Sequence, residues 1–349
     1  MRLAAIELYG IGSLSGVRIA FGDEPRAMTV LFGADGVGKT TVLGAIATTR
    51  PGHALPIIPR RTRVDDAAPR EVPFALADWI LGDDDPERPH PLRVMSPNAQ
   101  IQDDENALRR REQALFDKRA QERGGYAFAA FSGARWFSRT PVMLTTPERS
   151  VVRYDVRTSA SFDDASRADL TRETKQVLSY AGIAKALEPA ASDLGALDAA
   201  LRDVSQIALA PFNAQYEGVH AKTLEPIFSH EGRDAIFEEL PRGARHLVAI
   251  VTGALRVLHG AYASQESCKP LREREGVIVV DDLETQQDAA LLKHVPALLK
   301  ASLPRVQWIL ATSATPVTLG CERDEVLALR REPDESRVIV HEGAFAVLH

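Results

Sequence analysis

Residues 33–40 read GADGVGKT and match the pattern G-x-x-x-x-G-K-[ST] at every fixed position. The run Thr29–Phe32 before this stretch is apolar and rich in β-branched residues, as expected of a buried strand. Residues 41–47 after it have the apolar spacing of a helix. The segment therefore predicts a strand, a glycine-rich loop and a helix, in that order.

A loop of this kind, a P-loop, is suited to hold phosphate. Its glycines let backbone N–H groups turn inward around an anion, and the following helix N-terminus adds a positive potential. Lys39 is expected to reach the β- and γ-phosphates of ATP, and the Thr40 hydroxyl to bind Mg²⁺. The alternative is a glycine-rich turn without a ligand, which the flanking strand and helix disfavour. The expected nucleotide-binding residues are Gly33, Ala34, Asp35, Gly36, Val37, Gly38, Lys39, Thr40 and Thr41.

The composition is that of an ordinary soluble globular protein. A chain of 349 residues suffices for one large α/β domain with a lobe, or for two modest domains. The net charge of −6 argues against a protein that coats nucleic acid, although a local basic face for DNA stays open. The apolar stretch Leu247–Leu255 is too short to span a bilayer, so no membrane partner is expected. Two cysteines make no disulfide framework, and a reduced cytoplasm is the expected location.

Short strands are expected on both sides of the glycine-rich loop. Those before it form a small β-layer that leads to the nucleotide strand, because glycines and Pro25 separate three short apolar runs. The expected strands are Leu3–Leu8, Val17–Phe21, Met28–Phe32, Tyr126–Phe131 and Val151–Val156. The expected helices cover residues 103–123, Ala168–Leu187 and Leu194–Leu209.

Residues 277–282, VIVVDD, are a second candidate for the nucleotide site. Four apolar β-branched residues suit a central parallel strand, and two carboxylates follow it. This is the form of a Walker B strand, in which Asp281 holds Mg²⁺ and Asp282 activates water as the catalytic carboxylate. Any buried strand that ends in an acidic turn would look the same, so the assignment depends on the P-loop.

Between these motifs lies EELPRGARHL, residues 238–247, followed by a helix with apolar residues from Leu247 onward. The segment resembles the signature of ABC-type ATPases of the RecF and SMC (structural maintenance of chromosomes) group, which Leu240, Gly243 and Arg245 fit. Residues 6–21 resemble the N-terminal β-layer of that group, and DDLETQQD at 281–288 resembles its Walker B extension.

The resemblance implies a fold class and a domain organisation. We expect an α/β P-loop NTPase fold of the ABC ATPase type, with an N-terminal antiparallel β-layer, a mixed central sheet and a helical insert lobe. The whole chain, 1–349, would be one domain, with its core in 1–50 and 235–349 and the insert at about 51–234. The family also implies a head-to-tail homodimer in which Gly243, Ala244 and Arg245 face the ATP of the partner.

Three departures from the family favour ATP binding over fast hydrolysis. The signature serine is Pro241, which offers neither a hydroxyl nor an N–H. The usual catalytic glutamate is Asp282, shorter by one methylene. The switch histidine is Ser313, which cannot carry a proton at neutral pH. No glutamine-loop residue can be assigned, Gln100 and Gln102 being candidates only by their position.

Two classes of function fit these residues. The first is a slowly hydrolysing ATPase that acts as a switch for a separate effector protein, as in DNA repair or in the ATPase half of OLD-type (overcoming lysogenization defect) nucleases in phage defence. The second is a non-catalytic, nucleotide-dependent assembly or sensor module. A third option is a P-loop kinase or GTPase. The chain has no N-K-x-D string, which counts against a GTPase, and the signature-like segment counts against a kinase.

Arg135 follows the strand expected at Tyr126–Phe131. It could lie near a phosphate group. We favour the interpretation that it is a surface or interface residue, since that is the commoner place for such an arginine.

Overall fold

The structure is a computed structural model. It describes residues 1–11, 13–14, 16–22, 26–50, 73–80, 92–96, 114, 118, 125–142, 169–187, 193–263, 269–332 and 338–342. The strand expected at Val151–Val156 lies outside these residues, as do Gln100 and Gln102. So does the helix expected over 103–123, apart from residues 114 and 118.

The N-terminal strands form an antiparallel β-layer, as expected. Its strand order is β2-β1-β4-β5, and every neighbouring pair is antiparallel. Side chains of β1 on one face, including Leu3, Ile6 and Leu8, are fully buried. The strands are β1 (Arg2–Tyr9), β2 (Val17–Ala20), β4 (Phe74–Ile80) and β5 (Leu92–Met95).

The central sheet is mixed, which confirms the fold class. Its six strands lie in the order β13-β12-β3-β11-β10-β6, and all neighbours are parallel except β13, which is antiparallel to β12. Every residue of β10 is buried, as its unbroken apolar sequence predicts for a central parallel strand. The strands are β3 (Met28–Phe32), β6 (Ala127–Phe131), β10 (Gly276–Val280), β11 (Val306–Thr312), β12 (Val326–Arg331) and β13 (Val338–Glu342).

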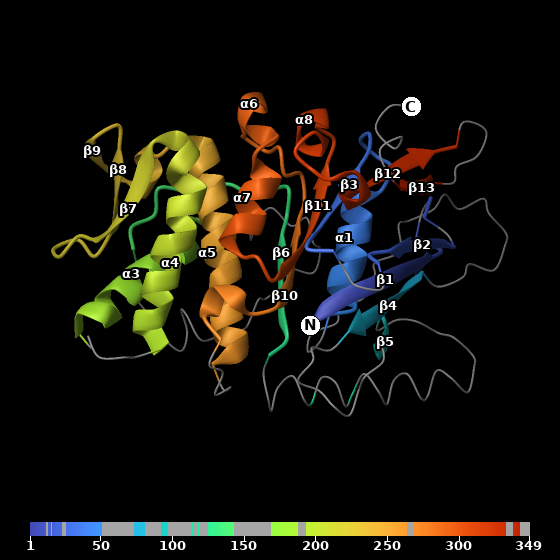
Figure 1. Cartoon of the computed structure of the whole chain (residues 1–349), viewed down its shortest axis with the longest axis horizontal. Helices are drawn as coiled ribbons and strands as arrows, with labels where there is room; N and C mark the ends of the chain where they lie inside the picture. Colours follow the sequence, from blue (N-terminus) through green and yellow to red (C-terminus); the bar gives the residue numbers. More distant parts are fainter. Residues whose placement is uncertain are drawn as a thin grey trace.

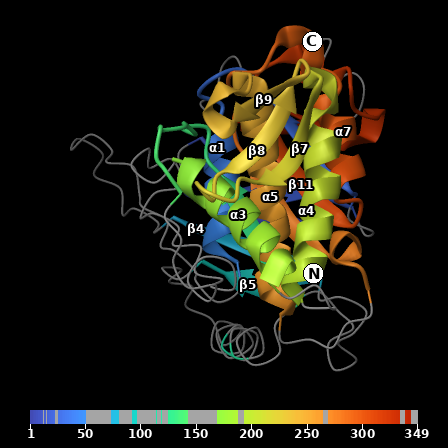
Figure 2. The same ribbon diagram turned by 90° about the vertical axis from the view of Figure 1, so that its left-hand side faces the viewer.

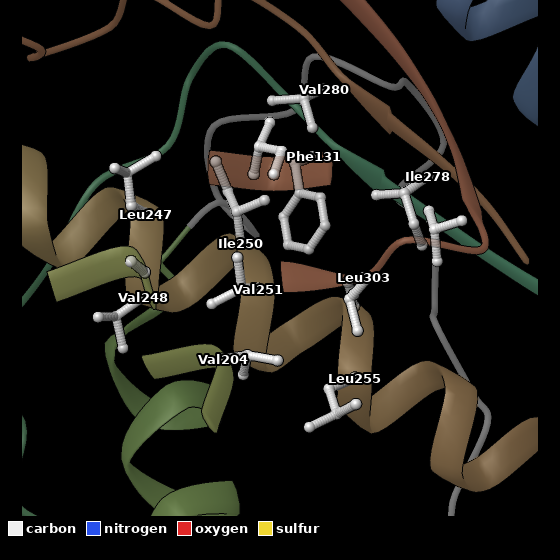
Figure 3. Packing of buried hydrophobic residues seen from close by; sticks show 14 of the residues in the cluster. Phe131, Val204, Leu247, Val248, Ile250, Val251, Leu255, Ile278, Val280 and Leu303 are labelled. Atoms are coloured by element: carbon white, nitrogen blue, oxygen red, sulfur yellow. The ribbon is translucent and has the colours of Figure 1, made fainter. Parts of the chain in front are cut away.

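Alternate side chains of the central strands enter two separate hydrophobic cores. Val277 and Val279 pack in one core with α1 (Lys39–Thr48) and the β-layer. Ile278 and Val280 pack in the other with the long helix α5 and its neighbours (Figures 1 and 3). The sheet is therefore covered on both faces. The helices of the second core are α3 (Thr171–Leu187), α4 (Asp193–Leu209), α5 (Arg242–Tyr262) and α7 (Val295–Ser302).

A small antiparallel sheet, β7-β8-β9, lies against α3 and α4 (Figure 2). The Tyr216 hydroxyl on β7 donates to the Leu178 carbonyl on α3 at 3.1 Å, which attaches the sheet to the helices. Its strands are β7 (Ala214–Val219), β8 (Pro226–His230) and β9 (Arg233–Ile236). The short helices are α6 (Ala289–Leu292), α8 (Thr315–Thr318) and 3₁₀ turns at Ala210–Phe212, Phe237–Glu239, Leu271–Glu273 and Arg323–Glu325.

Helix α5 begins at Arg242, five residues before the apolar periodicity starts at Leu247. Pro241 is its N-cap, with φ −49° and ψ 144°. Proline suits the start of a helix because the N–H that it lacks has no partner within the helix there. Gly243 and Ala244 consequently lie in the first turn of α5.

The parallel strands bring the candidate functional segments to one edge. Thr312 of β11 pairs with Phe32 of β3, and Val280 of β10 pairs with Phe131 of β6. The segments that follow these strands therefore all leave the sheet at its carboxyl edge, where open α/β sheets bind ligands.

Candidate nucleotide-binding site

The glycine-rich loop adopts a conformation that requires its glycines. Gly36 and Gly38 have φ of 79° and 101°, in the region that side chains rarely adopt. A Cβ at Gly33 would lie 2.6 Å from the Leu329 carbonyl oxygen, and one at Gly38 would lie 2.8 Å from Leu14 Cδ1. Gly38 is the N-cap of α1 and no side chain caps this end, so its first N–H groups can serve an anion.

Lys39 is held inside the loop. Its Nζ donates to the carbonyl oxygens of Gly33 at 2.8 Å and Ala34 at 3.0 Å, and the side chain is 5% exposed. Asp35 Oδ1 lies 3.7 Å from the same ammonium, but this aspartate is 94% exposed, so the pair contributes little. The loop therefore surrounds the ammonium group of its single lysine with its own carbonyl oxygens.

Asp281 lies beside Thr40, as the two motifs predict. The carboxylate is 2% exposed, and its Oδ1 has no hydrogen-bond partner among the described residues. Burial and the neighbouring Asp282 raise the pKa of Asp281 to about 6, against a hydrogen bond from the Thr40 side chain. A buried carboxylate oxygen without a partner, next to a hydroxyl, fits a small cation that prefers oxygen ligands, such as Mg²⁺.

The described residues contain no cluster of three or more His, Cys, Asp or Glu side chains that could hold a metal ion. Mg²⁺ is commonly bound through one or two protein groups together with the phosphates of a nucleotide. Thr40 and Asp281 are a donor set of that size.

Asp282 occupies a strained position in the turn after β10. Its φ is 42°, and its carbonyl accepts a hydrogen bond from Thr285 N at 2.9 Å. A Cβ at Gly133 would overlap its Oδ2, so the loop after β6 borders this carboxylate closely. Burial and the nearby Glu284 raise the pKa of Asp282, whereas Lys39 and Arg135 act in the opposite direction.

Ser313 is bound to Glu284, a site residue that the sequence analysis did not single out. Glu284 accepts hydrogen bonds from Thr312 Oγ1 at 2.6 Å, Ser313 N at 2.8 Å and Ser313 Oγ at 2.7 Å. Although burial opposes the shift, these bonds lower the pKa of Glu284. In the sequence, the feature that could have pointed to Glu284 is its position two residues after Asp282. The Ser313 hydroxyl uses its one proton in this contact.

The interpretation of Arg135 as a surface or interface residue is wrong. The side chain is 3% exposed. Its Nη1 donates to the carbonyl oxygens of Ser132 at 2.7 Å and Asp281 at 2.6 Å, and its Nη2 donates to that of Asp282 at 3.0 Å. Burial lowers the pKa of Arg135 to about 10, against the attraction of Asp281, Asp282 and Glu284.

The signature residues lie at the start of α5. Gly243 O accepts from Gln287 Nε2 at 3.2 Å, and a Cβ on Gly243 would lie 2.7 Å from Gln287 Oε1. The Arg245 guanidinium lies 5.5 Å from the ring centroid of Phe137. The first turn of α5 contains no acidic residue. Within the described parts of the chain, no hydrogen bond or ion pair joins Gly243–Arg245 to residues 33–41.

Comparisons with known proteins define the fold. No protein-family model matches the chain, and no curated protein matches it. Among solved structures, an Smc head bound to the C-winged helix domain of ScpA superposes with a TM-score of 0.53 and 13% identity, over 98% of each chain. This similarity supports a P-loop NTPase fold of the ABC-ATPase type.

Other similar structures are also SMC heads. The SMC head domain from Thermotoga maritima gives a TM-score of 0.47 at 11% identity, over 99% of this chain and 100% of that one. An Smc head with an extended coiled coil, bound to the C-terminal domain of ScpA from Pyrococcus furiosus, gives 0.43 at 13% identity, over 97% and 96%.

No helix in the described parts of the chain combines the length and the apolarity needed to cross a lipid bilayer.

Proposed function

We propose that this chain is an ABC-type ATPase that binds ATP with Mg²⁺ at residues 33–41 and hydrolyses it slowly. One observation carries the proposal. The P-loop, which encloses Lys39, follows β3, and Asp281 follows β10. These parallel strands flank β11, so the P-loop and the buried Asp281 carboxylate, which has one oxygen without a hydrogen-bond partner among the described residues, lie at the same edge of the sheet. A phosphate cradle next to a carboxylate of this kind is the arrangement that binds a nucleotide with a divalent cation.

Each residue has a proposed role. Lys39 binds the β- and γ-phosphates, while Thr40 and Asp281 hold Mg²⁺, which would neutralise charge on the phosphates. Asp282 orients the attacking water and accepts its proton. Hydrolysis is slow because Asp282 is shorter than a glutamate and its backbone is already fixed at φ 42°, which leaves little freedom to reach the water.

The proposed assembly is a head-to-tail homodimer in the cytoplasm. Gly243, Ala244 and the N-terminus of α5 would contact the γ-phosphate held by the partner, so ATP would close the dimer and its loss would open it. The exposed Arg242 at the start of α5 and the absence of an acidic residue in that turn support an anion as ligand.

A separate effector protein would respond to the opening and closing of the dimer. The similar Smc head with a TM-score of 0.53 was solved with the C-winged helix domain of ScpA bound to it. We propose that this chain likewise acts on a partner protein, in a pathway such as DNA repair or phage defence. DNA would be a further ligand, bound by a local basic face.

A second candidate is the non-catalytic assembly or sensor module. The bond from Ser313 Oγ to Glu284 Oε1, at 2.7 Å, favours it, since this hydroxyl has no second proton to offer a γ-phosphate. The Pro241 N-cap likewise supplies no hydroxyl.

Two assays on the same preparation test the proposal. Calorimetry with ATP and Mg²⁺ should give a binding isotherm, and a phosphate-release assay should give a turnover that Lys39→Ala abolishes. Tight ATP binding without turnover would favour the sensor module. No ATP binding at all would contradict both functions.

A further inference from the structure

Arg135 is a buried cation whose hydrogen bonds all go to backbone. Among the described residues, none of its hydrogen bonds goes to a side chain, and the guanidinium bridges three carbonyl oxygens, those of Ser132, Asp281 and Asp282. The first belongs to its own loop after β6, and the other two to the turn after β10. A planar guanidinium can serve these acceptors together because its N–H groups diverge in a fixed fork.

The turn after β10 needs such support. Asp282 has φ 42°, in the left-handed region that most residues with a Cβ avoid and that Asp and Asn adopt only as single residues. Asp281, Asp282 and Glu284 also place three carboxylates within a few residues, so their charges repel one another, and a buried cation offsets that repulsion.

Arg135 is itself held in place by the residue two positions on. Phe137 packs edge to face against Phe237, with ring centroids 5.5 Å apart, and against His246, at 4.8 Å. The Arg245 guanidinium lies 5.5 Å from the Phe137 ring centroid. The segment that carries Arg135 is therefore anchored on the 3₁₀ turn before α5 and on the first turns of α5, and the guanidinium is fixed before any ligand binds.

We propose that Arg135 is a positioning residue, which holds the backbone of Asp281 and Asp282 so that the Asp281 carboxylate meets the cation bound with the nucleotide. This inference rests on the proposed function. Arg135 acts through the turn and leaves the P-loop untouched, since none of its hydrogen bonds reaches residues 33–41.

The experiment compares Arg135→Met with Arg50→Met. Arg50 is also buried, at 4% exposed, and follows α1, which carries it about 15 Å from the P-loop at 1.5 Å per residue. ATP affinity is measured by calorimetry in EDTA and in Mg²⁺, and amide hydrogen exchange is followed in the peptide covering residues 281–287.

Arg135→Met should leave the ATP affinity in EDTA within about twofold of the parent, because the P-loop is intact. The Mg²⁺ gain, which is the ratio of the ATP affinity in Mg²⁺ to the ATP affinity in EDTA, should fall by about tenfold or more, as is typical when a residue that supports a metal ligand is replaced. Exchange in the 281–287 peptide should become faster. Arg50→Met should change none of these three readouts.

Arg135→Lys is the conservative variant, in case the methionine variant does not fold. The lysine keeps the charge but lacks the fork geometry, so its Mg²⁺ gain should lie between those of the parent and Arg135→Met. An unchanged Mg²⁺ gain with unchanged exchange in both variants would overturn the inference. Equal changes in Arg50→Met would overturn it as well.

Failure of the proposed function has a separate signature. If the parent protein binds no ATP, the calorimetric arm refutes the function, whereas the hydrogen-exchange arm still decides whether Arg135 holds the turn.

Discussion

At the residue scale, Lys39 is the side-chain cation that the P-loop encloses, with its Nζ 2.8 Å from the Gly33 carbonyl oxygen. Lys39→Ala should weaken ATP binding by at least about tenfold, because a charge-assisted hydrogen bond contributes about 1.5–3 kcal/mol. Calorimetry measures this change. Lys222 is exposed, and Lys222→Ala is the matched control, which should bind ATP like the parent. Unchanged affinity in Lys39→Ala would refute the P-loop assignment.

Asp282 separates binding from hydrolysis. Asp282→Asn keeps the size of the side chain, and asparagine tolerates the left-handed backbone at φ 42°. The amide accepts no proton from water, so phosphate release should fall to background while the calorimetric ATP affinity stays within about twofold. A parent-like rate of phosphate release would mean that another group activates the water.

His246 gives the folded chain a dependence on pH. Burial and the nearby Arg135 lower its pKa to about 4, against a weaker effect of Gln286. Its neutral form is therefore favoured in the folded state, and this stability is present above pH 6.5 and lost as the pH falls toward 4. Between pH 8 and pH 5 the parent should lose about 2 kcal/mol more than His246→Gln in urea unfolding.

The exposed His220→Gln is the control for this pH series and should lose as much stability as the parent. Equal pH dependence in the parent and His246→Gln would refute the assignment to His246.

The sequence could predict those candidate site residues whose chemistry lies in a local motif. Lys39, Thr40 and Asp281 follow from spacing within short strings, and the structure places Thr40 beside Asp281. Arg135 could not be placed in this way, because its partners Asp281 and Asp282 lie 146 and 147 residues farther along the chain. The residues around an arginine in the sequence do not indicate which distant backbone carbonyls will accept its hydrogen bonds.

At the element scale, α3 is joined to the approach to α5 by a buried ion-pair cluster. Lys175 is 3% exposed, and its Nζ lies 2.6 Å from Glu225 Oε2 and 2.8 Å from Glu238 Oε1. It also donates to the Thr140 carbonyl oxygen at 2.8 Å. The cluster thus joins the segment after Arg135, the β7-β8 connection and the residues just before Pro241.

Lys175→Met should lower the free energy of unfolding by about 3–5 kcal/mol, because it leaves two largely buried carboxylates without their cation. Lys185→Met on the same helix is the control. Lys185 is 51% exposed, and its partner Asp198 keeps an ion pair with Arg202, so the loss should stay below about 1 kcal/mol. Urea unfolding measures both, and equal losses in the two variants would contradict the importance of the cluster.

Elements were predictable where the pattern is local and regular. The strand at Met28–Phe32 and the helices α3 and α4 agree with their apolar spacing within a few residues. The first turn of α5 could not be read from periodicity, because RGAR has no apolar stripe and the start depends on Pro241. The strands that pair with β4 and β6 could not be predicted from the sequence either, because strand pairing is a contact between distant segments.

At the scale of the whole molecule, the proposed dimer has two sets of groups, those at the carboxyl edge of the sheet, which would bind the nucleotide of their own subunit, and those at the start of α5, which would meet the nucleotide of the partner. The proposed closure needs both. Within the described residues, a Cβ on Gly243 already meets Gln287 and Phe212 of the same chain, so a bulky residue there would disturb the subunit itself. The exposed Arg242 is therefore the better position at which to test the dimer contact.

Sedimentation velocity of the Asp282→Asn protein, with ATP and Mg²⁺ or with ADP and Mg²⁺, tests ATP-driven closure most directly. We expect ATP to shift the protein to twice the monomer mass, or to a more compact dimer if it already pairs, and ADP to leave it unchanged. Arg242→Glu should bind ATP yet fail to close, while the exposed Arg323→Glu should close normally. A protein that binds ATP but keeps the same mass and the same compactness with both nucleotides would contradict the ATP-dependent dimer.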